Sequence, residues 1–196
     1  MEIIRVFFAD LDRAWRLPRE GRIRLRVIGS AALMLGTGYS RGTKDGDILE
    51  TADVTGKVRD ELVVLAGKDS ALAVKYHLYL DIVAGGLPFL PQKPVFNPVK
   101  IQGLKNFEVS ALDVTDVVVS KLLRFNASDI SDIRAMAEKG LLKAEKLAER
   151  FQSAVDAFSM DARAEELPKY VKNLHSVERD FLEVPASDIR LPGWLE

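Results

Sequence analysis

Small polar and acidic residues that could bind a phosphate and a metal ion are spread over the first half of the chain. Gly29 and Ser30 follow an apolar run, and a Gly-Ser turn at the end of a strand can present backbone N–H groups and a hydroxyl to a phosphate. Asp45 and Asp47 are two positions apart, so on a strand their side chains share a face. Asp81, inside a later apolar run, can join them from a neighbouring strand. Three carboxylates beside a phosphate-binding turn suit phosphoryl or nucleotidyl transfer assisted by two Mg²⁺ ions.

The composition is that of a folded protein with little overall charge. The chain has 196 residues, of which 47% are hydrophobic and 29% charged, so we expect one packed domain or one domain with a small helical extension. A net charge of −1 gives no overall attraction to nucleic acid or to a membrane. The sequence has no cysteine and only two histidines. This excludes disulfides and thiolate metal sites and argues against a zinc hydrolase with several histidine ligands.

Nothing in the sequence indicates a membrane segment. No apolar run reaches the roughly 18 residues that would suggest a spanning helix. The N-terminus carries early charges and lacks the apolar core of a signal peptide. We therefore expect a cytoplasmic protein without a membrane partner.

Hydrophobic periodicity predicts an α+β fold. We expect strands over 22–28, 44–50, 76–83 and 106–112, and helices over 2–16, 31–35, 54–67 and 114–125. A long loop rich in glycine and proline is expected over 84–99. Later helices are expected from a cap at Ser128 or Asp129 to Lys139, over 141–158 and over 164–182, followed by an irregular tail. The order indicates a small mixed sheet with flanking helices over 1–113 and a helical C-terminal domain over 114–196.

Two segments of the sequence resemble known enzymes. Residues 28–33, followed by an Arg-x-Thr-x-Asp-x-Asp pattern over 41–47, resemble the signature of DNA polymerase β-like nucleotidyltransferases. This variant is typical of the minimal bacterial branch, which includes the AbiEii-like toxins of abortive-infection systems. Residues 116–124, followed by 129–133, are similar to the Lys-Leu-x-Arg and Asp-x-x-Asp-Ile segment of the same branch. Together the similar stretches cover roughly residues 25–135.

The resemblance implies a role for each candidate residue. Asp45, Asp47 and Asp81 would ligate Mg²⁺ or Mn²⁺, and Asp81 would also act as the base toward the acceptor hydroxyl. Gly29 and Ser30 would bind the β- and γ-phosphates of an NTP. The remaining predicted nucleotide-binding residues are Arg41, Lys121, Arg124 and Asp132.

Each of these predictions has a purely structural alternative. The sequence around Asp45 and Asp47 is also a good turn sequence, and Asp81 can be a polar residue on the solvent face of a strand. Gly29 and Ser30 can form an ordinary helix cap.

The basic candidates have alternatives as well. Lys121 and Arg124 share a helix face and can be solvated or paired with Asp129 and Asp132, which can instead cap a helix or interact with its dipole. Arg41 can be a surface residue. Arg22, Arg24 and Arg26 share a strand face, which can contact an RNA or DNA acceptor or lie exposed to solvent.

The leading hypothesis is therefore a Mg²⁺-dependent enzyme that moves a nucleotidyl group from an NTP such as ATP to an acceptor hydroxyl on RNA, protein or a small molecule. A second hypothesis makes this enzyme the toxin of a toxin–antitoxin pair, with an antitoxin as its protein partner. A third hypothesis is a nucleotide-binding or interaction module of the same fold without turnover.

Overall fold

The computed structural model describes residues 3–18, 20–40 and 42–195. The chain divides into two compact units. The first unit comprises residues 1–88 and 96–113, and the second comprises 89–95 and 114–196. The short segment 89–95 groups with the second unit, and the domain boundary expected after residue 113 stays a prediction.

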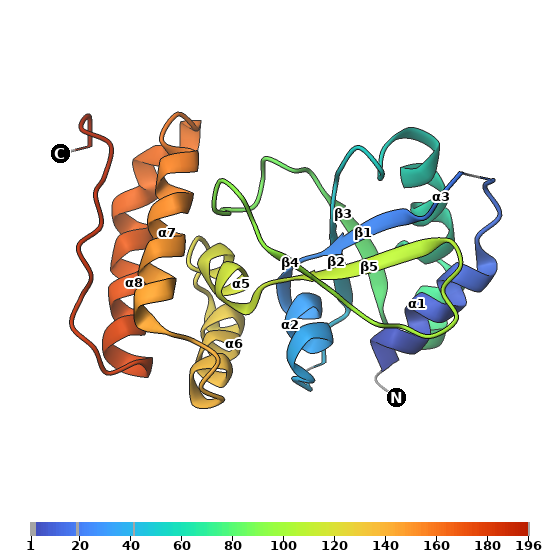
Figure 1. Ribbon diagram of the computed structural model, residues 1–196, viewed down its shortest axis with the longest axis horizontal. Helices are drawn as coiled ribbons and strands as arrows, with labels where there is room; N and C mark the ends of the chain where they lie inside the picture. The colour runs from blue at the N-terminus through green and yellow to red at the C-terminus, as the bar shows by residue number, and fades with distance from the viewer. Residues whose placement is uncertain (1–2, 19, 41, 196) are drawn as a thin grey trace. The chain divides into compact units, whose positions relative to one another are not determined.

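The first unit is a mixed sheet with helices. In chain order its elements are α1 (Ile3–Ala14), β1 (Ile23–Val27), α2 (Gly29–Thr37), β2 (Asp45–Leu49), α3 (Gly56–Ala66), α4 (Ala71–Tyr76), β3 (Tyr79–Val83), β4 (Phe96–Pro98) and β5 (Phe107–Leu112). In the described part of the chain the sheet has five strands in the order β3-β2-β1-β5-β4 (Figure 1). The pairs β1–β5 and β2–β3 are parallel, whereas β1–β2 and β4–β5 are antiparallel. The predicted α+β class with a small mixed sheet is confirmed.

Alternation along β1 separates a buried face from an open face of the sheet. Ile23, Leu25 and Val27 are almost fully buried, and their partners on β5 are buried as well. Arg24 and Arg26 point to the opposite face, as the sequence pattern predicts. The apolar stripe of α1 is also buried, which confirms the helix predicted over 2–16.

Asp12 on α1 holds the start of β5 by its side chain. The carboxylate is buried and accepts backbone N–H bonds from Lys105, Asn106 and Phe107 at 2.8–3.1 Å. It also accepts a bond from the side-chain amide of Asn106. These donors satisfy an otherwise costly buried charge and fix the strand that pairs with β1.

Two elements differ from the prediction. The strand expected over 76–83 begins only at Tyr79, because α4 occupies the preceding residues and ends where His77 adopts a left-handed conformation with φ +52°. Ser70 caps α4 by accepting a bond from the N–H of Ala73. The expected loop over 84–99 contains β4, an edge strand in which Pro98 is tolerated because it needs no donor on the outer side.

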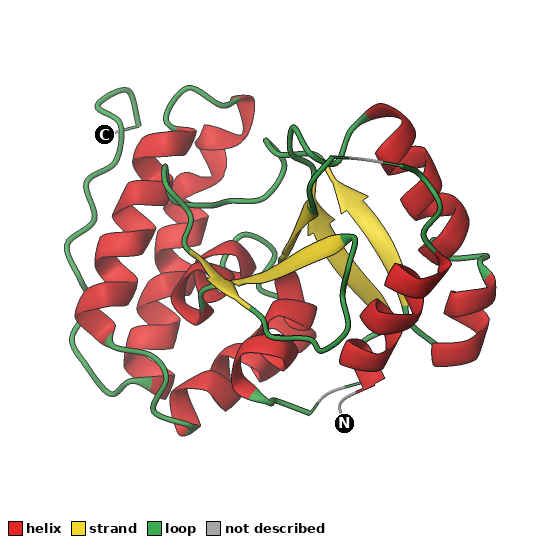
Figure 2. Ribbon diagram, turned by 45° about the vertical axis from the view of Figure 1, so that its right-hand side comes forward, coloured by secondary structure: helices red, strands yellow, loops and turns green. Residues whose placement is uncertain are grey.

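The second unit is helical. In chain order its elements are α5 (Val114–Lys121), α6 (Ala127–Glu138), α7 (Ala144–Phe158), a 3₁₀ helix (Ala162–Glu166) and α8 (Leu167–Phe181). Figure 2 shows these helices in red, with the strands in yellow in the first unit. Phe89, from the segment 89–95, packs in this core against Phe151, Phe158 and Tyr170. The irregular tail predicted after residue 182 is present.

The predicted ends of two helices were wrong. Helix α5 ends at Lys121 instead of 125, and Phe125 adopts φ +49° in the turn that follows. The cap of α6 is Asn126, whose side chain accepts a bond from the N–H of Asp129 at 2.9 Å, so neither Ser128 nor Asp129 is the cap. Gly140, with φ +67°, follows the end of α6 as expected.

Among the described residues, none of the helices has the length and apolar character needed to span a bilayer. The cytoplasmic location stays a prediction.

Candidate active site

The three predicted carboxylates lie on one face of the sheet. Asp45 and Asp47 are alternate residues of β2, so their side chains point the same way. Asp47 is the register partner of Asp81 on the parallel strand β3, and Asp45 is the partner of Tyr79. Parallel partners on adjacent strands direct their side chains to the same face, about 5 Å apart. The structure therefore gathers Asp45, Asp47 and Asp81, and it excludes the alternative that Asp45 and Asp47 form a turn.

Gly46 explains how two aspartates fit on this strand. It is buried on the opposite, apolar face, and a Cβ at this position would lie 3.2 Å from Cδ2 of Leu80 on β3. A glycine therefore lets β2 and β3 pack closely at this point. The residue between the two aspartates is part of a paired strand.

The Gly-Ser turn lies directly against Asp47. Gly29 has φ +64°, and a Cβ built there would come within 2.6 Å of Asp47 Oδ2. The N–H of Ile28 donates to the carbonyl oxygen of Asp47 at 2.9 Å, which ties the turn to β2. Ser30 lies in the first turn of α2, whose capping position is Ile28 without a side-chain cap, so Ser30 is not the helix cap.

The first turn of α2 has the chemistry of an anion site. The leading N–H groups of a helix lack acceptors within the helix and carry the positive end of its dipole. In this protein they begin at Gly29, beside the carboxylate of Asp47. A phosphate bound there would lie next to the carboxylate face of the sheet.

Two further residues, Thr43 and Tyr79, belong to this face, and neither was assigned a role from the sequence. The hydroxyl of Thr43 donates to Asp45 Oδ1 at 2.8 Å and so orients that carboxylate. Burial, followed by the negative charges of Asp45, Asp81 and Asp47, raises the pKa of the Tyr79 phenol above its usual value. Their alternation with the aspartates, at positions 43 and 79, is the signal that would have identified both.

The donor set suits a hard divalent cation. Carboxylate oxygens are the ligands that Mg²⁺ and Mn²⁺ prefer, and Asp47 and Asp81 are side by side on adjacent strands. Within the described ranges, no three His, Cys, Asp or Glu side chains are already arranged as a metal site. Asp45 and Asp81 are exposed, so a change of rotamer costs little. The residue types and their register fit a metal ion, and the side-chain positions require adjustment to hold it.

The basic residues predicted to bind the nucleotide are engaged within the second unit. Lys121 is only 4% exposed, and its Nζ lies 2.9 Å from both Asp129 Oδ1 and Asp132 Oδ2. Arg124 is exposed and reaches Asp129 at 3.3 Å. The ion pairs with Asp129 and Asp132, which were the structural alternative for Lys121 and Arg124, are therefore present. A nucleotide phosphate would have to compete with buried carboxylates for Lys121, and the nucleotide-binding role of Lys121, Arg124 and Asp132 stays a prediction.

Arg41, the last predicted nucleotide-binding residue, lies outside the described residues. Its place in the Arg-x-Thr-x-Asp-x-Asp pattern is two residues before Thr43.

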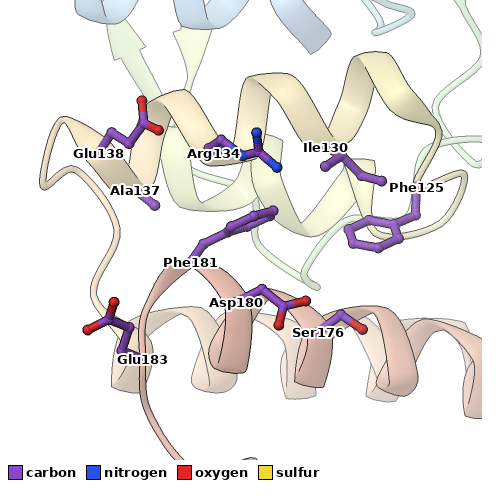
Figure 3. Close-up of a pocket in the computed structure, with 9 residues that line it drawn as sticks. All are labelled: Phe125, Ile130, Arg134, Ala137, Glu138, Ser176, Asp180, Phe181 and Glu183. Atoms are coloured by element: carbon purple, nitrogen blue, oxygen red, sulfur yellow. The ribbon is translucent and has the colours of Figure 1, made fainter.

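A wide pocket of about 740 Å³ lies in the second unit between α6 and α8 (Figure 3). The guanidinium of Arg134 lies 5.2 Å from the centre of the Phe181 ring. Three carboxylates, those of Glu138, Asp180 and Glu183, also line the pocket. One cation among three anions disfavours a bound triphosphate in this pocket.

One comparison with known proteins gives a match. The family model described as "Nucleotidyltransferase of unknown function (DUF6036)" matches residues 8–181. No curated protein and no solved structure matches the chain.

Proposed function

Because the chain belongs to this family of nucleotidyltransferases of unknown function, we propose that it transfers a nucleoside monophosphate from an NTP to an acceptor hydroxyl and releases pyrophosphate. The observation that carries the proposal is the register of Asp47 with Asp81, beside the turn where Gly29 begins α2. This arrangement brings an anion-binding helix end next to a set of carboxylates on a single sheet face.

Each residue of the face has a role in the proposed reaction. The N–H groups of the first turn of α2 and the hydroxyl of Ser30 bind the β- and γ-phosphates. Mg²⁺ or Mn²⁺, held by Asp45, Asp47 and Asp81, would neutralise the charge of the phosphates during transfer. Asp81 accepts the proton of the acceptor hydroxyl. The acceptor oxygen then forms a bond to the α-phosphorus while the bond from that phosphorus to pyrophosphate breaks.

The test compares the wild-type protein with Asp45→Asn/Asp47→Asn. We expect at least one of the four NTPs, ATP among them, to bind in the presence of Mg²⁺ by titration calorimetry, and the double variant to lose this binding. We also expect label from an α-³²P NTP to appear on RNA, protein or a small acceptor in a cell extract. Asp60→Asn, an exposed position on α3, is the matched control and should behave like the wild type. Equal label transfer by the double variant would overturn the assignment.

A nucleotide-binding module without turnover is the second candidate. It is favoured by the finding that, among the described residues, the three carboxylates are not already arranged as a metal site. This candidate predicts NTP binding without release of pyrophosphate under any acceptor condition. Pyrophosphate release that requires Asp47 would reject it.

A toxin role with an antitoxin partner would place the same reaction in a growth-control system. Growth arrest on expression, abolished by Asp47→Asn, is the expected result. Expression without arrest in several bacterial hosts would contradict this role.

A further inference from the structure

A basic groove of about 520 Å³ lies in the first unit, lined by residues of β1, β5, β4 and the segments beside them. Alternation along the chain aligns Arg22, Arg24 and Arg26, which all line this groove. Its other lining side chains include Phe96, Pro98 and Lys100. Phe96 and Pro98 come from the edge strand β4, opposite Leu112 and Ser110 of β5.

The groove carries a positive charge that the whole protein lacks. Its cations are Arg22, Arg24, Arg26 and Lys100, and the carboxylate among its lining residues is Glu108. Arg24 also forms an ion pair with Asp53, which does not line the groove; its Nε lies 2.6 Å from Oδ2 of Asp53. The protein as a whole has a net charge of −1, so this surface concentrates cations locally. Such a patch favours a polyanionic ligand.

The groove also offers an aromatic ring. Phe96 is half-buried, and the guanidinium of Arg26 lies 5.1 Å from the centre of its ring. Arginine and an aromatic side chain in contact form a common platform for an unpaired base, which needs a flat surface for stacking and a cation for its phosphate. A base inside a duplex is already stacked and cannot use this platform.

The row formed by Arg22, Arg24 and Arg26 runs toward the part of the sheet that carries the carboxylates. Arg26 precedes Val27, whose register partner on β2 is Ile48, the residue after Asp47. Alternate residues on a strand are about 6.6 Å apart, so the three arginines extend over about 13 Å. A row of this length matches the repeating charges of a polynucleotide better than the compact charge of one triphosphate. It ends beside the carboxylates that the proposed transfer needs.

From these observations we infer that the groove binds a single-stranded polynucleotide, with its phosphates on Arg22 and Arg26 and a base on Phe96. The role of the groove as the acceptor site rests on the proposed function, whereas binding of the polynucleotide can be measured without any transfer. The 3′ hydroxyl of the strand then approaches Asp81 from the side of β1.

The experiment measures binding of a fluorescein-labelled RNA of about twelve nucleotides, and of DNA with the same sequence, by anisotropy at low salt. We expect Arg22→Gln/Arg26→Gln to weaken binding at least tenfold and to reduce the dependence of log K on log salt by about 1.4, since each phosphate contact to a single strand contributes about 0.7. Phe96→Leu should weaken binding about tenfold through the loss of stacking.

The matched control is Arg13→Gln/Arg59→Gln, which removes the same charge from exposed positions of the first unit outside the groove. It should bind the oligonucleotide within about twofold of wild type. Thermal melting of every variant checks that the unit stays folded. Equal weakening in the control would show that only overall charge matters and would overturn the inference, as would the absence of binding by the wild type.

A parallel transfer assay separates this inference from the proposed function. Groove-dependent binding of the oligonucleotide without transfer of label from any NTP would support the groove and contradict the enzyme. Transfer of label to a protein or small acceptor, with no oligonucleotide binding, would support the enzyme and overturn the groove. Binding of RNA but not DNA would assign the strand as RNA, and binding of both would leave the groove a general single-strand site.

Discussion

The backbone of Gly29 lies against the carboxylate of Asp47, so closely that a Cβ on Gly29 would come within 2.6 Å of Asp47 Oδ2. The turn that begins α2 and the strand that carries the carboxylates therefore depend on each other. Any side chain at position 29 has to displace the residue that the proposed chemistry needs. This relationship links the backbone conformation of the turn to the position of the Asp47 carboxylate.

Gly29→Ala should destabilise the protein and abolish transfer. Its φ of +64° costs a non-glycine residue about 1–3 kcal/mol, and the contact with Asp47 adds to that cost. Urea unfolding measures the first effect and label transfer the second. The control is Gly36→Ala, a position in α2 with no atom within 4 Å of the new Cβ, where helix propensity predicts a gain of about 0.5–1 kcal/mol. Equal stability of the two variants would contradict the prediction.

Asp12→Ala should unfold the first unit at a lower denaturant concentration. Three backbone N–H groups, of Lys105, Asn106 and Phe107, lose their acceptor near the start of β5. An unsatisfied buried donor costs about 1–3 kcal/mol, and because only the N–H of Phe107 is fully buried, we expect a total loss of about 2–3 kcal/mol. Asp60→Ala, at an exposed helix position, should change the free energy of unfolding by less than about 0.5 kcal/mol. A loss below about 1 kcal/mol for Asp12→Ala would show that water replaces the carboxylate.

Most strands of the sheet could be predicted because their signals are local, whereas β4 lay within an expected loop. Alternation over 22–28 identified β1 and the face of its arginines, and the spacing of Asp45 and Asp47 gave their common face. The alignment of Asp47 with Asp81 depends on how β2 pairs with β3, a long-range choice of register that one sequence does not encode locally. The sequence therefore indicates the candidate residues, and the fold determines which of them are paired.

The missed features have similar causes. Helix α4 spans only Ala71–Tyr76, which is too short for a helical period to be recognised, so only the strand signal over 76–83 was identified. The early end of helix α5 was missed because the left-handed residue in the turn that follows is Phe125. The usual sequence signal for this conformation is glycine or asparagine. The partners of Lys121 lie on the next helix, and this turn brings them together.

Lys121→Met should strongly destabilise the second unit. It leaves Asp129 and Asp132 buried without the ammonium group that lies 2.9 Å from both. Removing one partner of a buried ion pair typically costs about 3–5 kcal/mol. Adding Asp129→Asn and Asp132→Asn should recover part of the stability because no uncompensated charge remains. Thermal and urea unfolding provide the measurement.

The same variant separates a structural role from nucleotide binding. Where Lys121→Met remains folded at low temperature, a purely structural role predicts an affinity for Mg·NTP equal to that of the wild type, because the side chain is engaged with Asp129 and Asp132. Arg124→Gln is the control and should cost less than about 1 kcal/mol, since Arg124 is exposed. A weaker NTP affinity at unchanged stability would assign Lys121 to the nucleotide site instead.

Tyr79 reports on the charge of the carboxylate face. Burial and the charges of Asp45, Asp81 and Asp47 hold its pKa above the usual value, so the neutral phenol is favoured in the folded state. Tyr79 therefore contributes stability that is fully present below pH 10 and is lost as the pH rises through the folded pKa. In the double variant Asp45→Asn/Asp81→Asn, the pKa of Tyr79 should fall toward that of an unperturbed tyrosine, so the loss of stability above pH 10 should be smaller and should be complete at a lower pH.

Phenolate absorbance at alkaline pH measures this pKa, and subtraction of the Tyr79→Phe curve isolates one of the four tyrosines. The carboxylate contribution acts through space, so the shift should shrink as salt screens the charges. Asp60→Asn should leave the titration of Tyr79 unchanged. If Asp45→Asn/Asp81→Asn left it unchanged as well, the charges of Asp45 and Asp81 would make no contribution, and burial together with the remaining charge of Asp47 would set the pKa of Tyr79.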